Sequence, residues 1–333
     1  MYLIIGASSF IGVHTVTEFL NQGCELIVTG RNNKYRNYYE EKGIEYLNLD
    51  LSKDGDFEQL PKSGVKGVIL LAGLLPANTP VNLDVDENAS DYFEINTKGT
   101  IRVLEYCRKV KADRILFSTT VFDISLSATN GAVLEPDMPY NFSYKGDHAV
   151  YVITKNTAIE FIKHYYEEYG LKYFIFRFPT IYNYSPYHYY HPNGVKTLRP
   201  VYRMIDQAIK GEPIELWGDP NYSKDMVHVY DCAQMICKAV EVNNIEHSWY
   251  NVGTGIPVTL EEQIKAIIKV FSPEDKKSQI IYKPEKPVGG GFLMDVSNAK
   301  KELGYEPQYD VEALFRNYKE EMQVNRFKEL RGE

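Results

Sequence analysis

The first twelve residues, MYLIIGASSFIG, constrain the fold more than any other stretch of this chain. Residues 1–5 form a continuous apolar run, as expected of a strand covered on both faces of a parallel sheet. Gly6, Ser9 and Gly12 follow at intervals of three, and apolar residues continue at helical spacing from position 11. A tight turn between a buried strand and a helix aims free N–H groups and the positive helix end at one point. The stretch therefore predicts a pyrophosphate-binding turn.

The rest of the first half alternates strands with helices. Strands are predicted at residues 25–29, 44–49, 67–72, 114–117 and 172–177, and helices at 91–109 and 149–169. This order predicts an α/β fold, a Rossmann-type doubly wound parallel sheet whose ligands lie outside the carboxyl ends of the strands.

After residue 178 the pattern changes. Residues 182–200, rich in Tyr, Pro, His and Asn, are expected to form a long loop, either contacting a ligand or packing on itself or a partner. Further helices are predicted at 201–210, 260–271 and 311–321, a strand at 213–217, and a return to the main sheet over 226–253. We therefore predict a dinucleotide-binding domain at 1–178 plus about 226–255. A smaller, discontinuous C-terminal substrate domain would comprise 179–225 and 256–333.

Composition excludes several classes of partner. The chain has 333 residues, a net charge of −8 and no basic block, which argues against nucleic acid. No apolar stretch is long enough to span a membrane, and because the chain begins with a strand, no signal peptide is expected. The four cysteines lack metal-ligand spacing, so we expect reduced thiols, no metal site and a cytoplasmic location.

The end of the second predicted strand bears on the choice of cofactor. An acid there binds the ribose 2′-hydroxyl of NAD, whereas an arginine favours the 2′-phosphate of NADP. The chain has Gly30, Arg31 and Asn32, with Lys34 and Arg36 close behind and no acid. The cofactor is therefore NAD or NADP, with Arg31 favouring NADP; the alternative is an ordinary solvated basic loop.

A Tyr-x-x-x-Lys pair carries the predicted chemistry. The pattern occurs at Tyr38/Lys42, Tyr151/Lys155 and Tyr282/Lys286, but only Tyr151/Lys155 opens a helix that follows a strand ending in hydroxyl residues. At i and i+4 both side chains lie on one helical face, where an ammonium favours tyrosinate. Tyr151 could then exchange a proton with a substrate hydroxyl, and Ser118 could hydrogen-bond the same oxygen. The alternative is a surface helix that happens to carry both residues.

Several motifs occur together in a recognisable order. They are GASSFIG, Asp50-Leu51, NTKGT from residue 96, FSTTVF, YVITK from 151, RFPT from 177, KDMVHVYD from 224, YNVGTG from 250 and DVSNAK from 295. With them the chain resembles the extended short-chain dehydrogenase/reductase family, the NAD(P)-dependent nucleotide-sugar epimerases and dehydratases. The resemblance covers nearly the whole chain.

The resemblance implies a role for individual residues, alongside the reasoning above. Ser118, Tyr151 and Lys155 match the catalytic trio. The expected cofactor-binding residues are Gly6, Ser9, Phe10, Ile11, Gly12, Arg31, Asn32, Asp50, Leu51, Leu71, Ala72, Gly73, Asn96, Tyr151, Lys155 and Pro179. The expected substrate-binding residues are Thr119, Thr120, Thr180, Asn183, Lys224 and Lys286. The family also implies a nucleotide-sugar substrate and a homodimer formed through the helices near 96–109 and 149–169.

Departures from the family pattern narrow the reaction. Ser9 replaces the middle glycine, which is tolerable if its φ is negative. Thr180 stands where many epimerases have Asn, and Phe122 replaces a common Tyr. Ser118 is followed by Thr119 and Thr120 rather than by the acid pair of the 4,6-dehydratases, which disfavours water elimination.

Three functions remain open. The first is epimerisation of a nucleotide sugar at C4, and the second is NADPH-dependent reduction of a 4-keto-sugar nucleotide. The third is a catalytically silent NADP-binding regulator, against which the intact Ser118, Tyr151 and Lys155 argue.

Overall fold

A parallel sheet of seven strands forms the centre of the protein. The computed structural model describes residues 1–76, 89–146, 148–185, 187–191, 195–287, 289 and 291–331. The sheet order is β14-β7-β5-β4-β1-β2-β3, and every neighbouring pair in it is parallel. The strands are β1 (Tyr2–Ile5), β2 (Leu26–Gly30), β3 (Glu45–Asn48), β4 (Gly67–Leu70), β5 (Arg114–Thr120), β7 (Lys172–Phe178) and β14 (His247–Asn251). The order reverses between β1 and β4, and the predicted doubly wound fold is confirmed.

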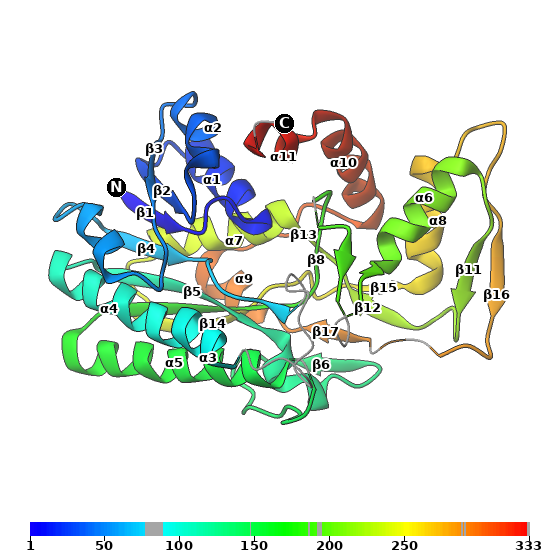
Figure 1. The fold of residues 1–333 in the computed structure, drawn as a ribbon. Helices are drawn as coiled ribbons and strands as arrows, with labels where there is room; N and C mark the ends of the chain where they lie inside the picture. The colour runs from blue at the N-terminus through cyan, green and yellow to red at the C-terminus, as the bar shows by residue number, and fades with distance from the viewer. Residues whose placement is uncertain are drawn as a thin grey trace.

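Alternate side chains of these strands enter two different apolar cores. Ile4 faces α1 (Phe10–Asn21) and α7 (Val229–Glu241), whereas Leu3 and Ile5 face α4 (Gly99–Val110) and α5 (Ala149–Tyr169). Figure 1 shows these helix pairs on opposite sides of the sheet. Both faces are covered, which explains the unbroken apolar runs of the central strands.

A third apolar core lies apart from the sheet. It joins α6 (Pro200–Lys210), α8 (Leu260–Phe271), α10 (Val311–Val324) and the parallel pair β11 (Ile214–Trp217) and β16 (Ile280–Lys283). Figure 1 shows these elements gathered at one end of the molecule. By contrast, α9 (Ser297–Leu303) contributes Ala299 and Leu303 to the core of α1 and α7. The domain boundaries drawn from the sequence stay a prediction.

Short strands connect the two ends of the molecule. β8 (Ile181–Tyr182) pairs with β13 (Val227–His228), and β6 (Ala132–Leu134) pairs with β17 (Phe292–Met294), both in parallel. β12 (Ser223–Asp225) pairs with β15 (Pro257–Thr259) in antiparallel fashion.

The tyrosine-rich segment differs from the predicted loop. Besides β8 it carries the antiparallel strands β9 (Tyr189–Tyr190) and β10 (Thr197–Leu198). Its residues 186 and 192–194, as well as 290 in the triple-glycine run, lie outside the described part of the chain.

The predicted helix over residues 91–109 is in fact three segments. They are α3 (Ala89–Tyr92), a π-helical turn (Phe93–Lys98) and α4. Asn96 lies in the π-helical turn, and such turns occur frequently at functional sites. The last described helix is α11 (Arg326–Arg331). It lies near the N-terminal elements of the chain, where it contacts the segment after β2. No helix among the described residues is long and apolar enough to cross a membrane.

Candidate functional site

The glycine turn after β1 depends on two positions that tolerate no side chain. Gly6 has φ +94°, and a Cβ on it would lie 2.7 Å from the backbone nitrogen of Ala72. A Cβ on Gly12 would overlap the carbonyl oxygen of Gly6 and lie 2.8 Å from the Cα of Ala7. The turn therefore packs directly against α1 and against the end of β4, and it holds the N-terminus of α1 close to the end of β1.

Ser9 caps the helix that follows this turn. It has φ −76° and ψ 166°, and its Oγ accepts a hydrogen bond from the backbone N–H of Gly12 at 3.0 Å. The negative φ explains why serine is tolerated where the family has glycine. The arrangement leaves the remaining N–H groups of the first turn at the end of the sheet where β1, β2 and β4 finish.

The ends of β2 and β3 lie side by side. Arg31 and Asn32 are exposed directly after β2, and Asn32 Oδ1 accepts from the backbone N–H of Lys34 at 3.1 Å. Asp50 binds the N–H and hydroxyl of Ser52 through one carboxylate oxygen, at 3.0 and 2.7 Å. Partial burial raises the pKa of Asp50, but these bonds and the charges of Lys53 and Arg31 bring it below its usual value. Leu51 is buried against Gly99.

Asn96 connects the end of β4 to α5. Its Oδ1 accepts from the N–H of Leu74 at 2.8 Å, and its Nδ2 donates to the carbonyl of Leu74 at 3.1 Å and to Thr154 Oγ1 at 3.3 Å. Leu71 and Ala72 both donate backbone bonds to Ile5. The segment after β4 is thus fixed from both sides.

Lys155 also lies close to the segment after β4. A Cβ on Gly73 would lie 3.2 Å from Asn96 Oδ1 and 3.9 Å from Lys155 Nζ. Lys155 is only 3% exposed, and its ammonium lies 3.9 Å from the centre of the Phe117 ring. Burial lowers the pKa of Lys155 to about 7. The structure therefore brings Gly73, Asn96 and Lys155 together.

Tyr151 lies one helical turn before Lys155 and is also buried. Burial is the main cause that raises its pKa above the usual value, and the negative charge of Asp123 adds to it. A hydrogen bond with Thr120 acts in the opposite direction. The hydroxyl of Ser118, which we expected to hydrogen-bond the same substrate oxygen as Tyr151, donates to the carbonyl of Leu70 at 3.5 Å. The hydroxyl in contact with Tyr151 is thus that of Thr120, whereas Thr119 Oγ1 is buried with no partner among the described residues.

The two other Tyr-x-x-x-Lys pairs have different surroundings. Lys42 lies 3.9 Å from the ring of Tyr38, at the end of α2 (Arg36–Glu40). Tyr282 is half-exposed on β16 and donates to Glu261 at 2.6 Å. Tyr151 and Lys155 differ from both other pairs because both of them are buried and both lie on the long helix α5.

Three of the predicted substrate residues, Asn183, Lys224 and Lys286, lie near the third core and the strands that join it to the sheet, whereas Thr119 and Thr120 lie on β5. Lys224 Nζ lies 5.4 Å from the Tyr182 ring, and no ion pair among the described residues includes it. Its neighbour Asp225 is buried and accepts hydrogen bonds from Thr254, Gly255 and Met294. The acid of the KDMVHVYD motif thus fixes the backbone that carries Lys224.

Lys286 and Asn183 are already engaged by other residues. Lys286 pairs with Glu215 at 2.7 Å, and its ammonium lies 4.4 Å from the Trp217 ring. Asn183 is buried and donates to Asn317 of α10 at 3.2 Å. Thr180 is exposed after β7, and Pro179 is partly buried. Sequence reasoning did not single out Trp217 as a site residue, although it is the last residue of the strand predicted at 213–217.

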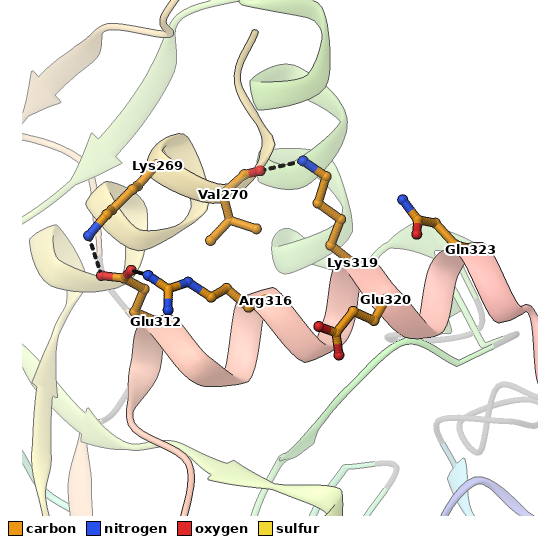
Figure 2. Close-up of a pocket in the computed structure, with 7 residues that line it drawn as sticks. All are labelled: Lys269, Val270, Glu312, Arg316, Lys319, Glu320 and Gln323. Atoms are coloured by element: carbon orange, nitrogen blue, oxygen red, sulfur yellow. Dashed lines mark hydrogen bonds and ion pairs between the residues drawn. The ribbon is translucent and has the colours of Figure 1, made fainter. Parts of the chain in front are cut away.

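A separate hollow of about 370 Å³ lies between α8 and α10 and contains none of the predicted site residues. Figure 2 shows Glu312 between Lys269, which it binds at 2.6 Å, and Arg316, while Lys319 donates to the carbonyl of Val270 at 2.7 Å. Lys269, Glu312 and Arg316 thus pair with one another, and the hollow is separate from the candidate site.

The fold and the glycine turn together define a Rossmann-type protein built to hold a dinucleotide. The chain belongs to the NAD dependent epimerase/dehydratase family, whose sequence model matches residues 2–253. This confirms the resemblance predicted from the motifs and identifies an enzyme of the extended short-chain dehydrogenase/reductase kind, in a family that uses NAD(P).

Relatives extend over nearly the whole chain. A protein of Methanocaldococcus jannaschii named putative UDP-glucose 4-epimerase is 27% identical over 93% of this chain and 94% of its own length. A dTDP-4-dehydro-6-deoxy-D-allose reductase of a Streptomyces species is 23% identical over 92% of this chain and 91% of its own. The crystal structure of the UDP-glucose 4-epimerase of Thermotoga maritima with UDP-glucose has a TM-score of 0.75 at 22% identity, covering 97% of this chain and 99% of that one.

Proposed function

We propose that this protein is a nucleotide-sugar epimerase that acts at C4 through Ser118, Tyr151 and Lys155. The observation that carries the proposal is the burial of Lys155 against Gly73, one helical turn after the buried Tyr151. When bound, a nicotinamide dinucleotide supplies a ring that accepts a hydride and returns it. The chain's own residues must then manage the proton and hold the sugar.

The phenol of Tyr151 exchanges the proton with the sugar hydroxyl. Burial opposes charge on both partners, because it raises the pKa of Tyr151 and lowers that of Lys155 to about 7. A phenolate and an ammonium on one helical face offset this cost for each other, so the charged pair can form together. The hydrogen bond from Thr120 favours the phenolate further. Epimerisation results when the keto-sugar turns over before the hydride returns to its other face.

The remaining site residues are proposed from their positions. The dinucleotide would contact Gly6, Ser9, Phe10, Ile11, Gly12, Arg31, Asn32, Asp50, Leu51, Leu71, Ala72, Gly73, Asn96 and Pro179 together with Tyr151 and Lys155. The close packing of Gly6 on Ala72 and of Gly12 on the Gly6–Ala7 backbone, which fixes a tight turn in front of the N-terminus of α1, supports this assignment. Thr119, Thr120, Thr180, Asn183, Lys224 and Lys286 would contact the nucleotide sugar.

Turnover of UDP-glucose tests the reaction, because relatives carry the name UDP-glucose 4-epimerase. The purified protein should convert UDP-glucose to its C4 epimer, and Tyr151→Phe should lower kcat by about 10² to 10⁴. Tyr282→Phe is the matched control, since this half-exposed tyrosine precedes a lysine at the same spacing but lies on β16. Turnover by Tyr151→Phe at the rate of the unsubstituted protein would contradict the assignment.

A second function, reduction of a 4-keto-sugar nucleotide by NADPH, is favoured by the end of β2. Gly30 and Arg31 stand there instead of an acid, and a relative is named a reductase of a dTDP-4-dehydro sugar. Binding of NADPH and NADH should be measured with and without Arg31→Ala. Freely exchanging NADPH, weakened by the substitution, would favour the reductase. Tightly retained NAD(H), unaffected by it, would favour the self-contained epimerase.

We further propose a homodimer formed through α4 and α5. The outer face of α5 supports this, because Ile153 and Phe161 are exposed beside a hollow that Phe142 and Tyr144 also line. Light scattering after size exclusion should give about twice the 38.3 kDa of the chain. Ile153→Lys should shift the protein towards the monomer.

A further inference from the structure

We infer that Tyr46 occupies the space at the end of β2 that an acidic side chain on residue 30 would need. Gly30 and Tyr46 together would then exclude the carboxylate that selects NAD and leave Arg31 to meet the ribose. The inference rests on the proposed site for the dinucleotide and deepens the proposed preference for NADP, because it names the residue that determines the choice.

The first step is the space around Gly30. Gly30 is the last residue of β2 and is buried, and a Cβ on it would overlap the hydroxyl of Tyr46. The same Cβ would lie 3.3 Å from Tyr46 Cζ and 3.0 Å from Ser8 Oγ, in the glycine turn. Gly30 is not among the residues with positive φ. Glycine is therefore needed here for space and not for backbone conformation.

The second step is that Tyr46 is held firmly in this space. It lies on β3 opposite Val28 of β2 and is fully buried, and its hydroxyl donates to the carbonyl of Asn32 at 2.7 Å. Its ring stacks on that of Tyr39 with centres 5.7 Å apart and planes 12° from parallel. A clash at residue 30 cannot be relieved by rotating an exposed side chain, so it would have to move buried structure.

The third step connects Tyr46 to both loops that approach a dinucleotide. Tyr39 donates its hydroxyl to the carbonyl of Ala7 at 2.6 Å, so the stacked tyrosines join the glycine turn to the segment that carries Arg31. Burial raises the pKa of Tyr46, which keeps the hydroxyl protonated and able to donate. Tyr39 and Tyr46 therefore fix the relative position of the pyrophosphate turn and the ribose edge.

The fourth step is the charge at this edge. Arg31 and Lys34 are exposed beside Asn32, and the guanidinium of Arg36 lies 5.7 Å from the Tyr46 ring. Arg36 is paired with Glu40 at 2.9 Å, whereas Arg31 and Lys34 are exposed at this edge, where Arg31 also helps to lower the pKa of Asp50. These cations suit the 2′-phosphate of NADP, whereas the 2′-hydroxyl of NAD is usually bound by an acid at the end of this strand.

The experiment is a double-mutant cycle on residues 30 and 46. Dissociation constants for NADPH and NADH are measured by fluorescence titration for Gly30→Asp, Tyr46→Phe and the pair, and each melting temperature is recorded without dinucleotide. Gly30→Asp alone should lower the melting temperature and bind neither dinucleotide well. Adding Tyr46→Phe removes the overlapping hydroxyl, so Gly30→Asp should cost less stability in the Tyr46→Phe background than in the unsubstituted protein, and the pair should bind NADH at least tenfold more tightly than Gly30→Asp. Gly55→Ala, where a Cβ meets nothing within 4 Å, is the control.

The outcomes separate this inference from the proposed cofactor preference. Gly30→Asp that is as stable as the unsubstituted protein and binds NADH tightly in the presence of Tyr46 would overturn the inference. Equal defects in Gly30→Asp and in the double variant would overturn it as well. A preference of the unsubstituted protein for NADH, unaffected by Arg31→Ala, would instead overturn only the proposed use of NADP. The melting temperatures would still show whether Tyr46 occupies the space that a side chain on residue 30 needs.

Discussion

Arg177 donates from Nε to both carboxylate oxygens of Asp123, at 2.9 and 3.2 Å, in a place where neither side chain is more than 1% exposed. Its Nη1 also donates to the carbonyl of Pro136 at 2.7 Å and to Asn251 Oδ1 at 3.2 Å. Arg177 thus connects the end of β7 to β14 and to the segment that follows β5.

Removing Arg177 should therefore destabilise the protein severely. Arg177→Met leaves the carboxylate of Asp123 buried without a counterion, which costs about 3 to 5 kcal/mol in comparable cases. The free energy of unfolding in urea measures this loss. Lys210→Met, which breaks the exposed pair with Asp206, is the control and should cost far less than Arg177→Met. Equal effects of the two substitutions would contradict the importance given to the buried pair.

Ser9 offers a prediction about the glycine turn. Ser9→Ala removes the Oγ that accepts from Gly12 and should lower the free energy of unfolding by about 1 kcal/mol. Ser9→Gly, which restores the family's residue, should cost only about a few tenths of a kcal/mol, since glycine is itself tolerated as a cap. Chemical denaturation of both variants checks this order, and a larger loss in Ser9→Gly would contradict the capping role.

Lys155 predicts a pH dependence of stability. Burial lowers its pKa in the folded protein to about 7, whereas the unfolded chain has the ordinary value of 10.5. Between these values the unfolded state binds the extra proton, so stability rises with pH. Relative to Lys155→Met, the unsubstituted protein should gain about 1.4 kcal/mol per pH unit above pH 7. Urea unfolding at pH 7, 8 and 9 measures the difference, and a constant difference would show that Lys155 titrates normally.

Thr120 is predicted to tune the phenol of Tyr151. Because its hydrogen bond lowers the pKa of Tyr151, Thr120→Val should move the rising limb of the kcat–pH profile to higher pH. Thr157→Val is the comparison, since this threonine lies outside the proposed site and its hydroxyl donates to the carbonyl of Ile153 within α5. An unchanged profile in Thr120→Val, with kcat lowered equally at every pH, would indicate that Thr120 acts only by packing.

The sequence predicted the sheet because its strands are buried on both faces and carry their own signal. The apolar runs at β1, β4 and β7 are visible in the sequence without knowledge of their neighbours. The helix predicted at 149–169 has the same bounds as α5. Asn96 was found by its motif, but its π-helical turn was not, because this turn depends on side-chain bonds to Leu74 and Thr154.

Contacts between distant segments could not be predicted. Ser118 was expected to hydrogen-bond the same substrate oxygen as Tyr151, but nothing in the sequence indicated that Thr120, two residues further along β5, contacts Tyr151 itself. Likewise Tyr46 gave no signal, because its importance lies in the space beside Gly30 on a neighbouring strand. Lys286 was assigned by charge alone, and its pairing with Glu215 depends on the adjacency of β11 and β16.

The C-terminal helix α11 provides the last prediction. Phe327 is 2% exposed, and its ring lies 6.3 Å from that of Phe10 at the start of α1 and 6.2 Å from the ring of His14. Lys42 pairs with Glu329 at 3.2 Å and so adds a second contact between α11 and the first half of the chain. The end of the chain therefore packs on the helix whose N-terminus faces the proposed pyrophosphate site.

Phe327→Ala should reduce both stability and dinucleotide affinity. The lost ring leaves a cavity beside Phe10 and costs about 3 to 5 kcal/mol if the helix stays in place. Because Phe10 begins α1, loosening this contact should also weaken dinucleotide binding, which titration of intrinsic fluorescence measures. Lys328→Ala, an exposed neighbour on the same helix, should change neither quantity. If Phe327→Ala loses stability but binds the dinucleotide as before, α11 has only a structural role. The order of the first turn of α1 would then not depend on α11.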